Sequence, residues 1–247
     1  MAKGKPGIAQ VSFSFVVVLA TALLLTISGC NKTETGEIAY NYEYYPYQVG
    51  HYVAYDVDSI SYSYSNPKYF RDTVHYQLKE EITDTFYDNE NALNYRLELS
   101  RRNTAADGWS IWKVWYIKPT VTNMQKVEDD VRFVKLVFPP HENETWNGNI
   151  YVPTTNNYDI YRNWTYTSTA VHQPYSVNGL NFDSTITVTE VNEEDVITKT
   201  LRREVYAKHV GLIYQEWEDM HKQLVNQTFD QATQTGFRIR MRVFDHN

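Results

Sequence analysis

The chain is short of glycine and cysteine. Its 247 residues include ten glycines and one cysteine, Cys30. The sequence contains no Gly-x-Gly-x-x-Gly motif, no Gly-Lys-Ser/Thr phosphate loop, no Gly-x-Ser-x-Gly nucleophile elbow and no His-Glu-x-x-His pair. A single cysteine excludes intrachain disulfides and zinc sites built from several thiolates. We therefore expect no cofactor and no catalytic residues, and we predict that the protein is not an enzyme.

Basic side chains are also in the minority. The chain has 23 Lys and Arg against 30 Asp and Glu, a formal net charge of −7. Lys3 and Lys5 are the only charged residues in 1–29, so loss of that segment brings the net charge near −9. Because an acidic surface repels a phosphate backbone, we expect no nucleic-acid partner.

The one long apolar run lies near the N-terminus, from Val11 to Cys30. A basic start followed by a short apolar run is typical of a secretory signal. The run ends on Ile27-Ser28-Gly29-Cys30, which resembles the lipobox of bacterial lipoproteins. That resemblance implies cleavage between Gly29 and Cys30 and lipidation of Cys30. The alternative is a retained transmembrane helix, but the run is short for the roughly 20 residues that a membrane span needs.

This signal divides the chain into three predicted parts. Residues 1–29 are the signal peptide, residues 30–46 are the lipidated cysteine and a tether, and residues 47–247 form a single β domain. The chain that remains after cleavage fits one large β domain better than two small ones.

Apolar and polar residues alternate through most of the predicted domain. Val53, Tyr55 and Val57 alternate with Ala54, Asp56 and Asp58, and the same pattern recurs in 74–83, 93–100, 180–188 and 237–244, and weakly in 158–169. Residues 131–138 and 212–217 are predicted to be further strands, and residues 109–117 are apolar on both faces. Period-two alternation predicts half-buried antiparallel strands. Asp107-Gly108, Asn147-Gly148 and Asn178-Gly179 predict turns between them. We predict an all-β fold with at most one short helix after the signal: an antiparallel curved sheet, either a half-barrel or a sandwich.

Residues 192–210 fit two kinds of element. Asn192 could cap a helix, with Ile197, Leu201 and Val205 on one helical face. The same three residues are separated by even numbers of positions, so they would also lie on one face of a strand. The sequence leaves both interpretations open.

Three segments carry a resemblance to known families. Residues 206–214, Tyr-Ala-Lys-His-Val-Gly-Leu-Ile-Tyr, resemble the Tyr-Ala-x-Gly-Val-Gly-Leu-Ile/Val element of some exported β proteins, with His209 where that element usually has glycine. Those proteins are curved antiparallel sheets, and several enclose apolar ligands. Residues 133–139 and 146–149 are similar to segments of an uncharacterised Bacteroidota outer-membrane lipoprotein family. The resemblance implies a β fold and an outer-membrane location, on either its periplasmic or its surface face, and it implies no activity.

Trp109, Trp112 and Trp115 are the strongest candidate binding residues. On a regular strand Trp109 and Trp115 share one face and Trp112 takes the other. Burial on both faces of a sheet would explain them as core residues. Exposed in a groove, they could instead stack on sugar rings or line an apolar pocket.

Arg238, Arg240 and Arg242 form a cationic stripe on the last predicted strand. One interpretation is that they protect an edge strand from pairing with another chain. The other is that they bind an anionic partner or a lipid headgroup.

Other charged groups have simpler explanations. His141, Glu142 and Glu144 follow two prolines, and their spacing suits a single metal ion poorly, so we predict a solvated loop and no metal site. The acidic runs at 128–130 and 193–195 are predicted to be solvated turns or a helix start.

These observations predict a membrane-anchored envelope lipoprotein of the outer membrane. Its domain would be a non-catalytic binding or interaction module for an apolar ligand or an envelope protein. One alternative is a structural accessory subunit of an outer-membrane assembly. Another is a glycan-binding or glycan-active surface protein, in which two carboxylates would cleave a glycosidic bond.

The anchor is tested by Cys30→Ser. We expect this variant to take up no radiolabelled fatty acid and to accumulate as the uncut precursor, because the thiol is the acyl acceptor and cleavage follows acylation. Metabolic labelling followed by electrophoresis measures both effects. Normal labelling of the variant would show that Cys30 is not the lipidation site.

Overall fold

The computed structural model describes Met1 and residues 40–65, 68–153, 155–223 and 226–247. The predicted signal peptide, Gly29, Cys30 and most of the tether lie outside these residues. The elements, in chain order, are η1 (Tyr42–Tyr44), β1 (Tyr52–Ser65), β2 (Lys68–Tyr87), β3 (Leu93–Arg102), β4 (Ser110–Pro119), β5 (Asn123–Glu128), β6 (Val131–Val137), β7 (Thr145–Trp146), η2 (Asn156–Tyr161), β8 (Tyr166–Val177), β9 (Leu180–Glu194), β10 (Thr198–Ala207), β11 (Gly211–Lys222), α2 (Phe229–Ala232) and β12 (Thr233–His246).

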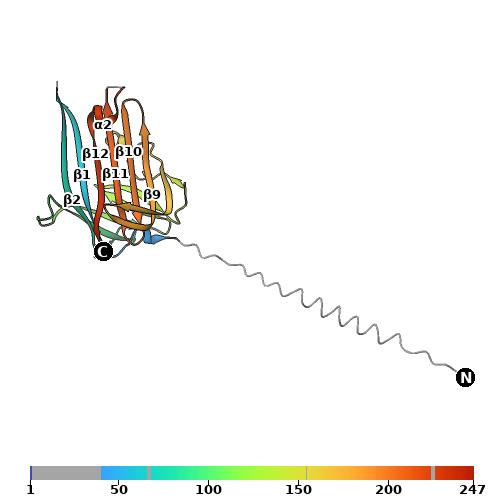
Figure 1. Ribbon diagram of the computed structural model, residues 1–247. Coiled ribbons are helices and arrows are strands. Elements are labelled where there is room, and N and C mark those ends of the chain that lie inside the picture. Colours follow the sequence, from blue (N-terminus) through green and yellow to red (C-terminus); the bar gives the residue numbers. More distant parts are fainter. Residues whose placement is uncertain (2–39, 66–67, 154, 224–225) are drawn as a thin grey trace. The chain divides into compact units, whose positions relative to one another are not determined.

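The strands form one antiparallel sheet whose order follows the chain. The order is β6-β5-β4-β3-β2-β1-β12-β11-β10-β9-β8-β7. Each half of the chain is therefore a meander, and the pairing of β1 with β12 joins the two halves. The long strands β1, β2 and β9 to β12 stand side by side in Figure 1, with the hairpin tips at one end. The prediction of an all-β antiparallel fold is confirmed.

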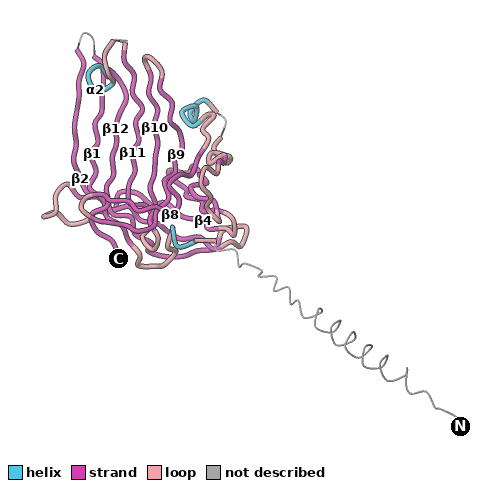
Figure 2. The backbone as a smooth tube through the Cα atoms, turned by 45° about the vertical axis from the view of Figure 1, so that its right-hand side comes forward, coloured by secondary structure: helices cyan, strands magenta, loops and turns pink. Residues whose placement is uncertain are grey.

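The sheet curves so that its two edges approach each other without closing into a barrel. The backbone N–H of Val134 on β6 donates to the carbonyl oxygen of Gly148, just after β7, at 2.8 Å. The Trp146 indole N–H donates to the Val134 carbonyl at 2.8 Å. Figure 2 shows β4 and β8 crossing the lower ends of the long strands. One side of the sheet is thereby concave, and the inward residues of opposite strands can meet there.

The turn chemistry explains several hairpins. Asn178 and Gly179 have φ angles of 52° and 81°, the positive values that a tight two-residue hairpin requires, and they join β8 to β9 as predicted. His209, where glycine was expected, adopts φ 66°. Its backbone N–H is held at 2.7 Å from the Glu43 carbonyl. The turn before β11 therefore keeps the glycine-like conformation without glycine.

Residues 192–210 form strands and turns rather than a helix. β9 runs to Glu194 and β10 begins at Thr198. Between them, one Asp195 carboxylate oxygen accepts from the backbone N–H groups of Ile197 and Thr198, at 2.8 and 2.6 Å. Pairing of β10 with both β9 and β11 outweighs the helical spacing, since those ladders satisfy the backbone groups along the strand.

Two parts of the chain differ from the sequence-based expectation. The weak alternation at 158–169 covers the end of η2 and only the start of β8. Strand β5 has no counterpart among the predicted segments. Its interior residues 124–127 are all buried, so it shows no alternation, although two of the four are polar.

The packed domain starts before Tyr47, the first residue of the predicted β domain. Tyr44 and Tyr45 are 0% and 6% exposed, and both belong to the apolar core. The core is drawn from residues between Tyr44 and Val243. The domain therefore contains its own core, and we expect residues 31–247 to fold without the signal segment.

In the part of the chain that is described, no helix is both long enough and apolar enough to cross a membrane.

Gly236 is a position where the backbone admits no side chain. It adopts φ 116°, and a Cβ there would lie 1.9 Å from the Asp219 carbonyl oxygen on β11. We expect Gly236→Ala in residues 31–247 to lower the free energy of unfolding by at least about 2 kcal/mol, because the backbone of β11 or β12 must move to make room for the Cβ. Urea denaturation measures this.

The matched control is Gly108→Ala. A Cβ at Gly108 would meet nothing within 4 Å, and the residue has no positive φ. Its substitution should change the free energy of unfolding by less than about 0.5 kcal/mol. Equal effects of the two substitutions would contradict the close approach of β11 and β12 at Gly236.

Candidate functional site

The concave side of the sheet holds a cavity of about 460 Å³. Residues from both halves of the chain line it, because the curvature brings β2 to β6 opposite β10 to β12. The lining residues are Tyr76, Leu78, Glu80, Leu99, Trp112, Lys113, Trp115, Lys126, Glu128, Asp129, Val131, Phe133, Tyr158, Ile160, Tyr161, Arg202, Gln215, Trp217, Ile239 and Met241. Most are apolar or aromatic, as is usual for small-molecule sites.

Two of the three predicted tryptophans line the cavity. The pairing of β3 with β4 shifts register between Leu99–Lys113 and Ser100–Ile111, so Trp112 is the extra residue of a β-bulge. A bulge re-aims side chains, and here Trp112 and Trp115 both line the cavity instead of taking opposite faces. The expectation that Trp112 lies on the other face from Trp115 is wrong for this reason.

Trp109 lies elsewhere. It precedes β4, and its ring packs under the Arg102 guanidinium, whose central carbon is 4.3 Å from the ring centroid. The Lys79 ammonium is 5.9 Å from the same centroid. Trp109 is thus a partner for surface cations and does not line the cavity.

The floor of the cavity is charged. Glu80, Lys126, Glu128 and Arg202 reach it, and Lys135, Glu190 and Glu204 lie behind them. We call these seven side chains the buried charged cluster. They come from β2, β5, β6, β9 and β10, so the cluster connects the two halves of the sheet across its concave side.

Lys135 is the centre of the cluster. Its side chain is 0% exposed, and its Nζ donates to Glu190 Oε1 at 2.7 Å and to Glu204 Oε1 at 2.9 Å. Glu204 Oε2 accepts from the Tyr206 hydroxyl at 2.5 Å. These charge-assisted bonds compensate the loss of hydration that burial imposes on each ion.

Arg202 ties the remaining carboxylates to this centre. Its Nη2 donates to Glu128 Oε2 at 3.2 Å, and its Nε lies 3.3 Å from Glu190 Oε2. Its guanidinium carbon lies 4.6 Å from the centroid of the Trp217 ring. Arg202 is 2% exposed, so the cation is held by protein groups.

Lys126 links the cluster to the cavity wall. Its Nζ donates to Glu80 Oε1 at 2.8 Å and lies 3.8 Å from Glu128 Oε1. The same ammonium lies 4.9 Å from the Trp115 ring centroid. The position of Trp115 is thereby coupled to the charged floor.

The cluster has one more carboxylate than it has cations. Three cations face four carboxylates, a net charge of −1 when all are ionised. Burial raises the pKa of Glu190 to about 7. The positive charge of Arg202 lowers this pKa and the negative charge of Glu204 raises it, but the effect of burial is the largest. The pKa of Glu128 is lowered to about 2, because the attraction of Lys135, Arg202 and Lys126 outweighs its desolvation. One carboxyl group in the cluster therefore gains or loses a proton near neutral pH.

Three donor atoms of the cavity-lining residues Arg202 and Trp217 have no hydrogen-bond partner among the described residues. They are Arg202 Nε, Arg202 Nη1 and Trp217 Nε1, and all three atoms are buried. Arg202 packs over the Trp217 ring, and the protein around them shields these donor atoms.

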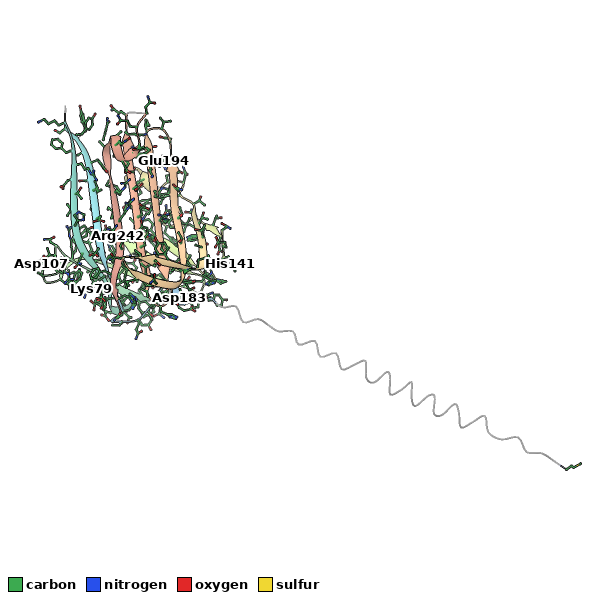
Figure 3. The ribbon with its side chains drawn as sticks, viewed as in Figure 1. Lys79, Asp107, His141, Asp183, Glu194 and Arg242 are labelled. Carbon is green, nitrogen blue, oxygen red and sulfur yellow. The ribbon has the colours of Figure 1, made fainter. Side chains whose placement is uncertain are left out.

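The arginine stripe lies on an interior strand. β12 pairs with β1 on one side and β11 on the other, so the edge-protection interpretation is wrong. Arg238 contacts Glu218 at 2.5 Å, Arg240 contacts Glu216 at 2.7 Å, and Arg242 pairs with Asp58. In Figure 3 Arg242 lies part-way along the long strands. Binding of an anionic partner by this stripe stays a prediction, and such a partner would compete with these carboxylates.

The other charged candidates are structural. Glu142 accepts from the backbone N–H groups of Ala170 and Val171, and Glu144 accepts from that of His141. Figure 3 places His141 at the side of the sheet. Within the described residues no group of three or more His, Cys, Asp and Glu side chains is placed to hold a metal ion.

The acidic run at 128–130 is only in part a solvated turn. Asp129 and Asp130 form the turn between β5 and β6, with φ of 48° and 67°. Glu128 instead points inward, where its side chain is 14% exposed within the buried charged cluster. Its predicted exposure is wrong because Arg202 and two lysines lie opposite it.

The sequence-based analysis missed Lys135, Glu190, Arg202, Glu204 and Trp217. The sequence carried a signal for Lys135, which stands between the apolar residues Val134 and Leu136 of its strand. Glu190, Arg202 and Glu204 are buried too, but each has a polar neighbour in its strand, so alternation does not mark them. Such a residue needs a buried partner of opposite charge. Which residue is the partner depends on the curvature of the sheet.

No family model and no curated protein sequence matches the chain. Among solved structures it is similar to a crystal structure from Bacteroides fragilis, described as a candidate exported protein with a YmcC-like fold. The two are 8% identical with a TM-score of 0.36, and the match covers 81% of this chain and 98% of that one. At these values the likeness carries no functional argument.

The raised pKa of Glu190 predicts a pH dependence of stability. The folded protein binds this proton more tightly than the unfolded chain, so the contribution of Glu190 to stability falls as pH rises from the usual carboxyl range through 7. Glu190→Gln abolishes that titration. We expect the variant to gain stability relative to the wild type between about pH 5 and about pH 8.

Urea denaturation of both proteins at the two pH values measures this difference. Glu193→Gln, an exposed carboxylate on the same strand, is the control and should follow the wild type. The free energies of unfolding of wild type and Glu190→Gln would differ by the same amount at both pH values if Glu190 did not hold this proton.

Proposed function

We propose that this chain is an outer-membrane lipoprotein whose β domain is a non-catalytic binding module for a ligand with an apolar body. The observation that carries the proposal is the cavity on the concave side of the sheet. Its volume of about 460 Å³ lies within the range of roughly 300–1,000 Å³ usual for small-molecule sites. The position of the cavity between the two halves of the chain is also typical of ligand sites.

The lining supports an apolar ligand. Trp115, Phe133 and Met241 form walls from three different strands, and Trp112 stands at the rim with 47% of its surface exposed. Aromatic side chains supply large contact areas at a small cost in side-chain entropy. The apolar surface of a ligand that enters past Trp112 would leave water and contact these aromatic and apolar side chains.

The anchor is proposed from the sequence. Residues 1–29 carry the signal pattern and Cys30 the acyl-acceptor thiol, while the packed domain begins near Tyr40. About ten residues separate the lipidated cysteine from the domain, so a short segment would tether the domain to the membrane. Lipid chains contribute about 0.8 kcal/mol per buried methylene, so the anchor of this protein would be firm.

The carboxylates at the cavity support binding rather than glycoside cleavage. A glycosidase needs one carboxylic acid that is still protonated near neutral pH. Ion pairs lower the pKa of Glu128 to about 2, and Glu80 is engaged by a hydrogen bond from the Lys126 ammonium. Neither side chain is suited to protonate a leaving group. Glu190, whose pKa is raised to about 7, has no exposed surface and does not line the cavity, so it cannot reach a glycosidic oxygen there.

A second candidate function is an interaction with another envelope protein. Tyr64, Tyr69 and Phe70 are 49%, 51% and 51% exposed at the tip of the β1–β2 hairpin. Val196 and Ile197 are exposed at the β9–β10 turn, at the same end of the sheet in Figure 1. Exposed apolar tips of this kind favour a protein contact, as an accessory subunit would make.

Ligand binding is tested with the neutral fluorescent probe N-phenyl-1-naphthylamine and residues 31–247. We expect the probe to bind and to quench tryptophan fluorescence. Trp112→Ala should weaken binding about tenfold, because it removes the aromatic wall at the rim. Fluorescence titration measures both effects.

The matched control is Ile111→Ala. Ile111 is the neighbouring residue on β4, is 64% exposed and does not line this cavity. Its substitution should leave probe affinity unchanged. Absence of probe binding to the wild type, or equal losses in the two variants, would contradict binding in the cavity.

A further inference from the structure

One cation beside the cavity has no carboxylate partner among the described residues. Arg101 lies near the end of β3, and its guanidinium carbon is 3.8 Å from the centroid of the Tyr76 ring, which lines the cavity. Within the described residues this guanidinium forms no ion pair and no hydrogen bond. Lys113, another cation at the rim, is already paired with Asp129 at 2.5 Å. Arg101 is therefore the rim cation that has its charge available.

The strand register places Arg101 on the face of the sheet that forms the cavity. Arg101 pairs with Leu78 on β2, and it follows Leu99 by two positions on β3. Both leucines line the cavity, and cross-strand partners and residues two apart on a strand share a face. Arg101 is partly exposed, and its side-chain nitrogen atoms reach solvent, unlike the unpaired nitrogens of Arg202. Its charge thus stands at the boundary between the apolar lining and water.

A second pocket, of about 350 Å³, adjoins the cavity at this boundary. Arg101, Arg102 and Trp112 help to line it, and Trp112 also lines the cavity. The charged residues in its lining are two arginines and Asp107, a net charge of +1. Asp107 already accepts from the backbone N–H and the hydroxyl of Thr104, at 2.8 and 2.9 Å. The adjoining pocket therefore offers one uncompensated positive charge to a ligand.

We infer that the ligand is a long-chain amphiphile with a single negative charge, such as a fatty-acid carboxylate, whose alkyl chain fills the cavity and whose oxyanion lies in the adjoining pocket against Arg101. This inference rests on the proposed binding function. A guanidinium stacked on a ring keeps its N–H groups around its edge, where two of them can donate to one oxyanion.

The charge of the cavity floor fixes the orientation of this ligand. The buried charged cluster has a net charge of −1 when all its members are ionised. An anion on the floor would add a second uncompensated negative charge to a poorly hydrated site, which is costly. The alkyl chain therefore points toward the floor, and the oxyanion stays at the boundary with water.

The first experiment needs no variant. Decanoate and decanamide compete with N-phenyl-1-naphthylamine for residues 31–247 at about pH 8, where decanoate is ionised. The chains have the same length and the amide carries no charge, so an apolar cavity without a cation would prefer the amide. We expect decanoate to bind at least about fivefold more tightly than decanamide. Raising sodium chloride from about 0.05 M to about 0.5 M should reduce this preference, because salt screens a partly exposed cation.

Arg101→Gln identifies the cation. It should lower the affinity for decanoate about tenfold and leave the affinities for decanamide and the probe unchanged. Arg71→Gln is the matched control, because Arg71 also lies over a tyrosine ring, 6.0 Å from the Tyr62 centroid, but lines neither pocket. It changes the net charge of the protein by the same amount and should leave decanoate affinity as it was. Circular dichroism and urea denaturation establish that both variants are folded.

The outcomes separate the two proposals. Decanamide binding at least as tightly as decanoate in the wild type, or equal decanoate affinities in folded Arg101→Gln and Arg71→Gln, would overturn the inference and leave the binding function standing. Absence of probe binding and of any displacement in the wild type would overturn both.

Discussion

The structure depends on the burial of seven charged side chains on the concave side of one sheet. Lys135 has no solvent exposure and is held by Glu190 and Glu204 from the other half of the chain. Removing one member of such a cluster leaves an uncompensated buried charge, which is far more costly than an exposed ion pair is worth. The curvature that brings β6 opposite β9 and β10 is therefore a condition for the burial of these ions.

The same cluster gives the cavity its character. Apolar strand faces alone would enclose a uniformly apolar space, whereas here the walls are aromatic and the floor is charged. Lys126 connects the two, since it binds Glu80 and lies near the Trp115 ring. Fixed dipoles and ions of this kind need no reorganisation when a ligand arrives, and they give such a cavity selectivity for the polar end of what it holds.

Much of the fold could be predicted because strand alternation is local. The segments around Val53, Tyr95 and Ile239 alternate over enough residues to define strands, and Asn178-Gly179 marks its hairpin. Strand β5 was missed because it is buried on both faces and does not alternate. The arginine stripe was placed on an edge because the sequence cannot show that β12 pairs with β1, some 180 residues away along the chain.

Short-range pattern and composition were enough to predict the export signal, the candidate lipidation site at Cys30 and the all-β class. Which inward residues meet was decided by the tertiary structure. It made Trp112 a cavity residue through a β-bulge, placed Glu128 as a buried ion where a surface acid was expected, and brought Arg202 over Trp217. Those outcomes depend on register and curvature, which arise from long-range strand pairing rather than from any local run of residues.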